Sequence, residues 1–126
     1  MKTKKENRDL NCNFFSDQRG EIYINKFKGI EFNVIFTKAG GYRAGDYHPT
    51  EQYSIILKGK IKLTLRQKNK DVSKQYGPNK LIIIPPNTPH LYKFITDTVI
   101  VEWLAGHYRA QYYEPYRKII NNQLEN

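Results

Sequence analysis

Strict alternation of apolar and polar residues in GKIKLTLRQ, residues 59–67, most constrains the fold of this chain. Ile61, Leu63 and Leu65 alternate with polar residues, so one face of an extended segment is buried and the other is wet. Similar apolar runs, rich in β-branched and aromatic residues and bounded by turn residues, occur at 21–25, 30–37, 53–59, 80–96 and 98–105. We expect helix only in the tail from His107, with Pro115 opening its last segment. The pattern predicts an all-β sandwich or barrel of antiparallel strands with a short C-terminal helical segment.

The length and composition indicate one domain. We expect a flexible N-terminal segment over 1–13, which is mostly polar, and a single domain over 14–126. Cys12 is the only cysteine, so no internal disulfide can form. No run approaches the roughly 18 apolar residues that cross a bilayer, and the basic N-terminus lacks the apolar core of a signal peptide. These features predict a cytoplasmic protein with no membrane partner.

The net charge of +9 indicates an anionic partner without identifying one. The lysines are dispersed through KFKG, LKGKIKL and RQKNK, and no recognised nucleic-acid-binding module is present. We therefore expect no nucleic-acid partner. A small anion, such as a nucleotide diphosphate, fits the charge equally well.

Two segments carry the residues that can perform chemistry. In a strand, positions two apart face the same way, so Asp46 and His48 point together, and Gln52 and Ser54 follow them if the pattern continues past Pro49. In the second segment His90 and Tyr92 share a face. If both faces line one barrel interior, these side chains converge in a cavity of the kind that binds small molecules.

These two segments resemble the paired motifs of the cupin superfamily. The first is GYRAGDYHPTEQYSIILKGKI (41–61), and the second is GPNKLIIIPPNTPHLYKF (77–94). The resemblance implies a jelly-roll barrel. The metal-binding cupin pattern has two histidines and a glutamate in the first motif, and here the glutamate position falls on Gln52. Two imidazoles and an amide are a poor ligand set. We therefore expect no metal or other cofactor, with His48, Gln52 and His90 as the alternative metal ligands.

A narrower resemblance covers residues 14–120. FFSDQRGEIYI, NVIFT with GGYRAGDYH, and GHYRAQYYEPYRKII are similar to segments of the metal-independent sugar-nucleotide cupins, namely deoxysugar ketoisomerases and, more distantly, dehydrorhamnose epimerases. Aligned on Arg43, the family's first histidine falls on Asp46, its second on His48 and its glutamine on Gln52. The replacement of the first histidine by Asp46 is the main departure from the family.

The resemblance implies an isomerase, a ketoisomerase or epimerase acting on a thymidine-diphosphate deoxysugar for surface polysaccharide biosynthesis. His48 would be the general acid/base, because an imidazole titrates near neutrality, and Asp46 would orient it or replace the missing base. Arg43 would hold the diphosphate. The remaining expected substrate-binding residues are Gln52, His90 and Tyr92. The resemblance also implies a homodimer.

Two other functions remain open. One is a non-catalytic cupin that binds a sugar or another small ligand, as the missing histidine would allow. The other is a metal-dependent cupin, an oxygenase or isomerase. Each residue also has a purely structural interpretation: His48 as a strand end, Asp46 as a turn residue, and His90 as a partner of the adjacent turn.

Overall fold

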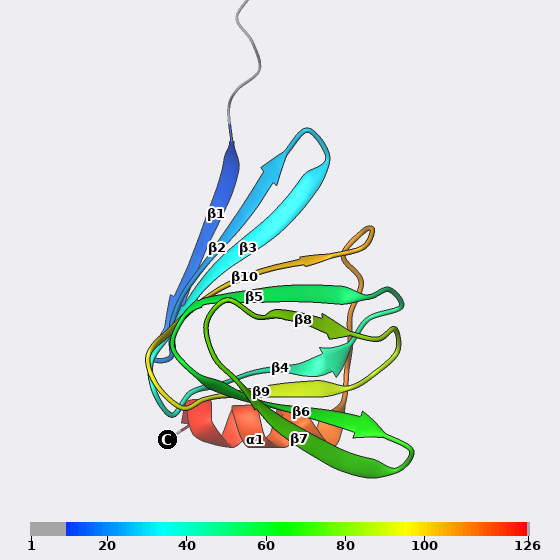
Figure 1. Ribbon diagram of the computed structural model, residues 1–126. Helices are drawn as coiled ribbons and strands as arrows, with labels where there is room; N and C mark the ends of the chain where they lie inside the picture. The colour runs from blue at the N-terminus through cyan, green and yellow to red at the C-terminus, as the bar shows by residue number, and fades with distance from the viewer. Residues whose placement is uncertain (1–9, 126) are drawn as a thin grey trace, which may run out of the picture.

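The structure, a computed structural model, describes residues 10–125 as two facing antiparallel sheets and one helix (Figure 1). The first sheet has the strand order β1 (Asn11–Asp17), β2 (Gly20–Phe27), β3 (Ile30–Thr37), β10 (Thr98–Leu104), β5 (Gln52–Lys58), β8 (Leu81–Ile84). The second has the order β11 (Gln111–Tyr112), β4 (Tyr42–Tyr47), β9 (His90–Phe94), β6 (Ile61–Gln67), β7 (Lys70–Tyr76). Helix α1 (Glu114–Glu125) closes the described chain. The all-β jelly-roll prediction is confirmed.

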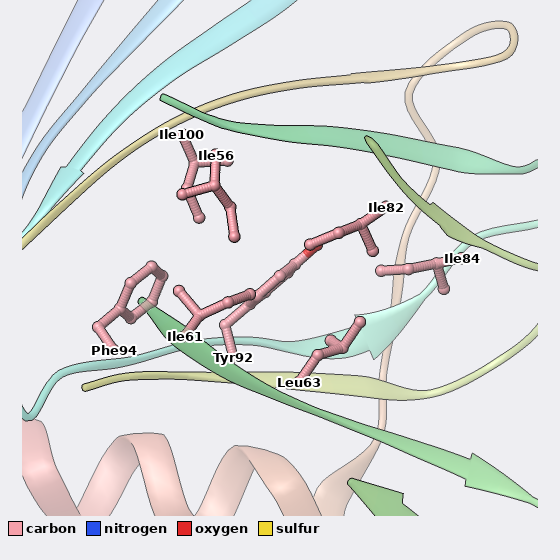
Figure 2. Packing of buried hydrophobic residues seen from close by; sticks show 8 residues of the cluster. All are labelled: Ile56, Ile61, Leu63, Ile82, Ile84, Tyr92, Phe94 and Ile100. Atoms are coloured by element: carbon pink, nitrogen blue, oxygen red, sulfur yellow. The ribbon is translucent and has the colours of Figure 1, made fainter. Parts of the chain in front are cut away.

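The core fills the space between the sheets (Figure 2). Its residues are those that the alternating patterns turn inward, and each is at most 3% exposed. They come from both sheets: Ile56, Ile61, Leu63, Ile82, Ile84, Tyr92, Phe94 and Ile100. Three of these core residues, Tyr92, Phe94 and Ile100, also line the cavity described below.

Helix α1 lies on the outside of the second sheet (Figure 1). Tyr116 and Ile120 of the helix pack against Leu91, which points out of β9. The hydroxyl of Tyr116 also donates to Asp71 of β7 at 2.5 Å. The outer face of the second sheet is therefore covered where α1 crosses it.

The structure adds strands that the sequence patterns did not predict, and it shortens the helix. Strand β7 (KDVSKQY) is almost entirely exposed and carries no apolar stripe, so it is an edge strand held by its pairing with β6. The tail was expected to be helical from His107, but residues 111–112 form β11 and the helix begins only at Glu114. Pro115, which has no backbone N–H to donate, lies in the first turn.

Two further points concern the chain as a whole. The flexible segment predicted for 1–13 falls mostly outside the described residues, and residues 11–13 belong to β1. Among residues 10–125, no helix is long and apolar enough to cross a membrane.

Candidate functional site

A cavity of about 360 Å³ opens between the two sheets. Its walls come from β4 and β9 on one side and from β2, β3, β5 and β10 on the other. All six side chains that the sequence singled out line it: Arg43, Asp46, His48, Gln52, His90 and Tyr92. The structure therefore brings residues of both motifs together around one cavity.

A β-bulge in β4 turns Asp46 toward the cavity. Ala44 pairs with Leu91 and Asp46 pairs with His90, so Gly45 is the extra residue without a partner on β9. Ala44 and Gly45 both have positive φ, 80° and 69°. Because of the extra residue, Arg43 and Asp46 both face inward although they are an odd number of positions apart.

Both histidine rings are held through Nδ1. His48 Nδ1 lies 2.8 Å from the carbonyl oxygen of Arg109, and His90 Nδ1 lies 3.0 Å from that of Thr88. A carbonyl oxygen can only accept, so these contacts assign the proton of each neutral ring to Nδ1. Each Nε2 is then left with a free lone pair.

The two Nε2 atoms converge on one carboxylate oxygen. Asp46 Oδ1 is 3.3 Å from His90 Nε2 and 3.6 Å from His48 Nε2, and the ring centroids are 5.3 Å apart. Asp46, His48 and His90 are 8%, 6% and 1% exposed. Among the described residues, neither Asp46 Oδ1 nor His90 Nε2 has a hydrogen-bond partner. Three electron-rich atoms therefore face one another in a buried space.

This arrangement has room for a proton or a cation. Burial lowers the pKa of His90, an effect that the charge of Asp46 only partly opposes, so the deeper ring tends to stay neutral. The ligand atoms of Asp46, His48 and His90 all lie within 4.8 Å of one another. Two imidazoles and a carboxylate form a common ligand set for zinc and other divalent transition metals, and carbonyl acceptors on the second ring nitrogen are the usual outer shell. The donors present fit such an ion.

Gln52 contacts other residues than the two histidines with which the alternative metal-ligand set groups it. Its amide nitrogen donates to Glu102 Oε2 at 3.1 Å and to the hydroxyl of Tyr92 at 3.3 Å. The residue that the structure places with the two histidines is Asp46. Tyr92 also exchanges a 2.8 Å hydrogen bond with Ser54, and burial raises its pKa far above the usual range, so it is a neutral phenol.

Arg43 is buried in the wall of the cavity. Its Nε donates to the hydroxyl of Thr37 at 2.8 Å, and it is 5% exposed. Burial, reinforced by the charge of Arg19, lowers its pKa to about 10, so it remains a cation at neutral pH. Part of its guanidinium is thus engaged within the protein.

Glu102 is a cavity residue that the sequence reasoning missed. It lies on β10, faces Gln52 and shares the cavity with Asp46. Burial, with the charge of Asp46 as the next cause, raises its pKa to about 7. The sequence contained a signal for this residue. In TVIVEWLA (98–105) the glutamate is the only charged residue, and it lies two positions after buried Ile100, on the same face of the strand. A lone carboxylate at an inward strand position indicates a functional or strained site.

Two exposed tyrosines belong to the cavity lining. Tyr108 is 59% exposed, and its ring centroid is 5.7 Å from that of His48. Tyr112 lies under the guanidinium of Arg117, with 4.3 Å from Cζ to the ring centroid. The third histidine, His107, is exposed and does not line the cavity.

Comparison with protein families gives a match to the Cupin domain over residues 34–106, more than half of the chain. The chain belongs to the cupin family. The matched segment contains both motifs, from β3 to the end of β10, and includes Asp46, His48, His90 and Glu102. Among curated proteins, no sequence matches this cupin.

Solved structures show the same fold. The capsular polysaccharide assembling protein CapF from Staphylococcus aureus has a TM-score of 0.67 and 18% identity over 84% of this chain and 32% of its own. A Lactobacillus farciminis oxalate decarboxylase formate complex has a TM-score of 0.71 and 14% identity over 91% of this chain and 39% of its own. A Bacillus subtilis oxalate decarboxylase with Mn(II) centres has a TM-score of 0.68 and 12% identity over 79% of this chain and 29% of its own. This cupin spans about a third of the length of these structures.

Proposed function

We propose that this cupin isomerises or epimerises a keto-sugar carried on a nucleotide, in the biosynthesis of a surface polysaccharide. The observation that supports it best is the pair of Nε2 lone pairs of His48 and His90, which face Asp46 in a cavity between the sheets. The structural similarity to a capsular polysaccharide assembling protein agrees with this role. The thymidine-diphosphate carrier and the cytoplasmic location stay predictions.

The proposed chemistry begins with removal of a proton from the carbon beside the carbonyl group. His48 Nε2 accepts this proton, because its Nδ1–H is already held by the carbonyl of Arg109. Asp46, 3.6 Å away, stabilises the imidazolium that forms. The proton then returns to the neighbouring carbon for isomerisation, or to the opposite face of the same carbon for epimerisation.

Forming the enediol needs a proton on the carbonyl oxygen, and its collapse needs a proton removed: from the adjacent hydroxyl for isomerisation, or from the same oxygen for epimerisation. We assign this transfer to Glu102, a cavity side chain whose pKa burial raises to about 7. Gln52 holds its carboxylate at 3.1 Å. Arg43, as a buried cation in the cavity wall, is our candidate for attracting the diphosphate.

The test follows solvent proton exchange in D₂O. Purified protein is mixed with a thymidine-diphosphate 4-keto-deoxysugar, and deuterium incorporation beside the carbonyl is followed by NMR. We expect His48→Asn to lose exchange about 100-fold or more. His107→Asn is the matched control, since His107 is exposed and outside the cavity, and it should leave exchange unchanged.

Other outcomes separate the alternatives. Binding of the nucleotide sugar without any exchange would indicate a non-catalytic ligand-binding cupin. Undiminished exchange in His48→Asn would remove His48 from the mechanism and overturn the assignment.

A second candidate is a metal-dependent cupin, favoured by the unpartnered Asp46 Oδ1 and His90 Nε2. Asp46, His48 and His90 would hold the ion, which when bound would act as a Lewis acid on a carbonyl oxygen. Calorimetric titration with Zn²⁺ or Mn²⁺ tests this directly. Asp46→Asn should abolish binding and Gln52→Ala should retain it, whereas the reverse result would restore the ligand set with Gln52.

A further inference from the structure

Contacts from the C-terminal segment, residues 107–125, fix the positions of both His48 and Asp46. The carbonyl oxygen of Arg109 holds the His48 ring through Nδ1 at 2.8 Å. Strand β11 pairs with β4 at Asp46, and α1 follows β11 directly along the chain. This segment lies beyond the residues that match the Cupin domain, which end at 106. The geometry of the site therefore depends on a part of the chain outside the matched segment.

The bulge that turns Asp46 toward the cavity is strained. Ala44 has a side chain and yet a φ of 80°. A residue other than glycine keeps such a conformation only where its surroundings hold it there. The backbone N–H of Tyr113 donates to the carbonyl oxygen of Gly45 at 2.9 Å. Nη1 of Arg117 donates to the carbonyl oxygen of Ala44 at 3.1 Å, so both residues of the bulge are held from the outside of the second sheet.

The side chain of Arg117 lies between the bulge and β11. Its guanidinium stacks on the ring of Tyr112, with 4.3 Å from Cζ to the centroid, and Tyr112 is the residue of β11 that pairs with Asp46. Its Cδ packs against Gly45, where a Cβ would lie only 2.8 Å from it. Arg117 therefore contacts β4 and β11 at residues that are next to Asp46 in sequence or in register.

We propose that Arg117 is a positioning residue, which acts through the carbonyl oxygen of Ala44 to keep Asp46 between His48 and His90. Without this donor the Ala44 carbonyl loses a hydrogen bond while the strain of the positive φ remains, so the bulge relaxes and Asp46 Oδ1 moves away from the two Nε2 atoms. These atoms now lie 3.3 and 3.6 Å from Oδ1. A displacement of about 1 Å in a catalytic group can cost about 100-fold in rate. Arg117 thus serves whatever chemistry Asp46 performs, whether proton transfer or the holding of a cation.

The first test is the D₂O exchange assay, and it rests on the proposed function. Arg117→Met keeps the aliphatic stem and removes the donor, so the exchange rate at saturating nucleotide sugar should fall about 10- to 100-fold while the half-saturating concentration stays within about 2-fold of wild type. Arg117→Lys retains a donor for the Ala44 carbonyl and should keep at least about a third of the wild-type rate. Lys118→Met, at an exposed position on the same helix, is the matched control and should change neither value.

A double variant shows whether Arg117 acts through Asp46. Once Asp46→Asn has removed the carboxylate, adding Arg117→Met should cost no more than about 2-fold. Losses that simply multiply would overturn the proposal. So would a higher half-saturating concentration with an unchanged rate, which would make Arg117 a substrate-binding residue. An Arg117→Lys variant as impaired as Arg117→Met would also overturn it, because the donor to Ala44 would then not be the feature that matters.

The second test needs no turnover, so it separates this inference from the proposed function. Nitrogen-15 NMR of the imidazoles, at about pH 8 with a chelator present, reports on Nε2 of His48 and His90, the atoms that face Asp46 Oδ1. Arg117→Met should shift these signals as Asp46→Asn does, whereas Arg117→Lys and Lys118→Met should leave them as in wild type. If Arg117→Met does not fold, Arg117→Gln, whose side chain is too short to reach the Ala44 carbonyl, replaces it in both tests.

The two tests together distinguish the possible failures. Unchanged imidazole signals in Arg117→Met would overturn the inference even where exchange falls. Shifted signals in a protein that never exchanges would support the inference and overturn the proposed function alone.

Discussion

Asp46 and His90 face each other across the pairing of β4 and β9, with Asp46 Oδ1 3.3 Å from His90 Nε2. Neither atom has a hydrogen-bond partner among residues 10–125. A buried acceptor without a donor costs free energy, typically about 1–3 kcal/mol. The fold thus holds two acceptors together where a proton or a cation can bind.

Asp46→Asn should stabilise the protein while removing its chemistry. The amide of the new side chain can donate to His90 Nε2, so we expect a gain on the order of 1 kcal/mol in the free energy of unfolding, measured with urea in the presence of a chelator. Proton exchange into the sugar should fall about 100-fold, because the imidazolium of His48 loses its counter-charge. A loss of stability would instead mean that Asp46 pairs with a protonated histidine in the resting protein.

Glu102→Gln should remove a pH dependence of stability. The pKa of Glu102 is raised from 4.5 to about 7, so the folded state binds more protons than the unfolded state between these values. Wild-type stability should therefore fall as pH rises from about 4.5 to 7, with the full penalty present above pH 7.

The size of this penalty follows from the shift in pKa, which corresponds to about 2–4 kcal/mol. Urea unfolding at pH 4 and pH 8 measures it: the variant should match wild type at pH 4 and exceed it at pH 8. Glu125→Gln, at an exposed position, should follow wild type at both values. Equal stability of wild type and Glu102→Gln at pH 8 would show that the carboxylate is hydrated.

Gly45→Ala should damage the bulge that positions Asp46. A Cβ at Gly45 would lie 2.8 Å from Arg117 Cδ and 3.0 Å from Ile120 Cδ1, in addition to the strain of φ +69°. Gly29→Ala carries a comparable φ of +77° but meets nothing within 4 Å, so it isolates the backbone strain of about 1–2 kcal/mol.

We expect Gly45→Ala to lose about 1–3 kcal/mol more than Gly29→Ala, and to lose exchange activity as well. Thermal unfolding and the D₂O exchange assay provide the two readouts. Equal losses in the two variants would show that α1 yields without moving β4.

Ile56→Ala tests the core beneath the cavity. Ile56 is fully buried in the cluster of Figure 2, so its truncation should cost about 2–5 kcal/mol of unfolding free energy. Ile95→Ala, at a position 37% exposed, should cost clearly less. Comparable losses would mean that the cluster closes over the vacated space at little cost.

Local patterns were sufficient to predict most strands and the shared face of the site residues on β9. The alternation that buries Ile61 and Leu63 also turns His90, Tyr92 and Phe94 to one side, and all of these are buried. Strand β7 was not predicted from the sequence, because an exposed edge strand carries no alternating apolar pattern. Glu102 was not predicted as a site residue, because the apolar run 98–105 was used only to predict a strand.

The sequence by itself determined the all-β architecture, the two motifs and the faces on which their polar residues lie, because side-chain direction in a strand follows from a two-residue period. Only the tertiary structure decided that Asp46 joins His48 and His90 while Gln52 contacts Glu102. The bulge at Gly45 and the pairing of Asp46 with His90 depend on contacts between segments more than 40 residues apart. Such contacts also bury Glu102, and no local pattern specifies them.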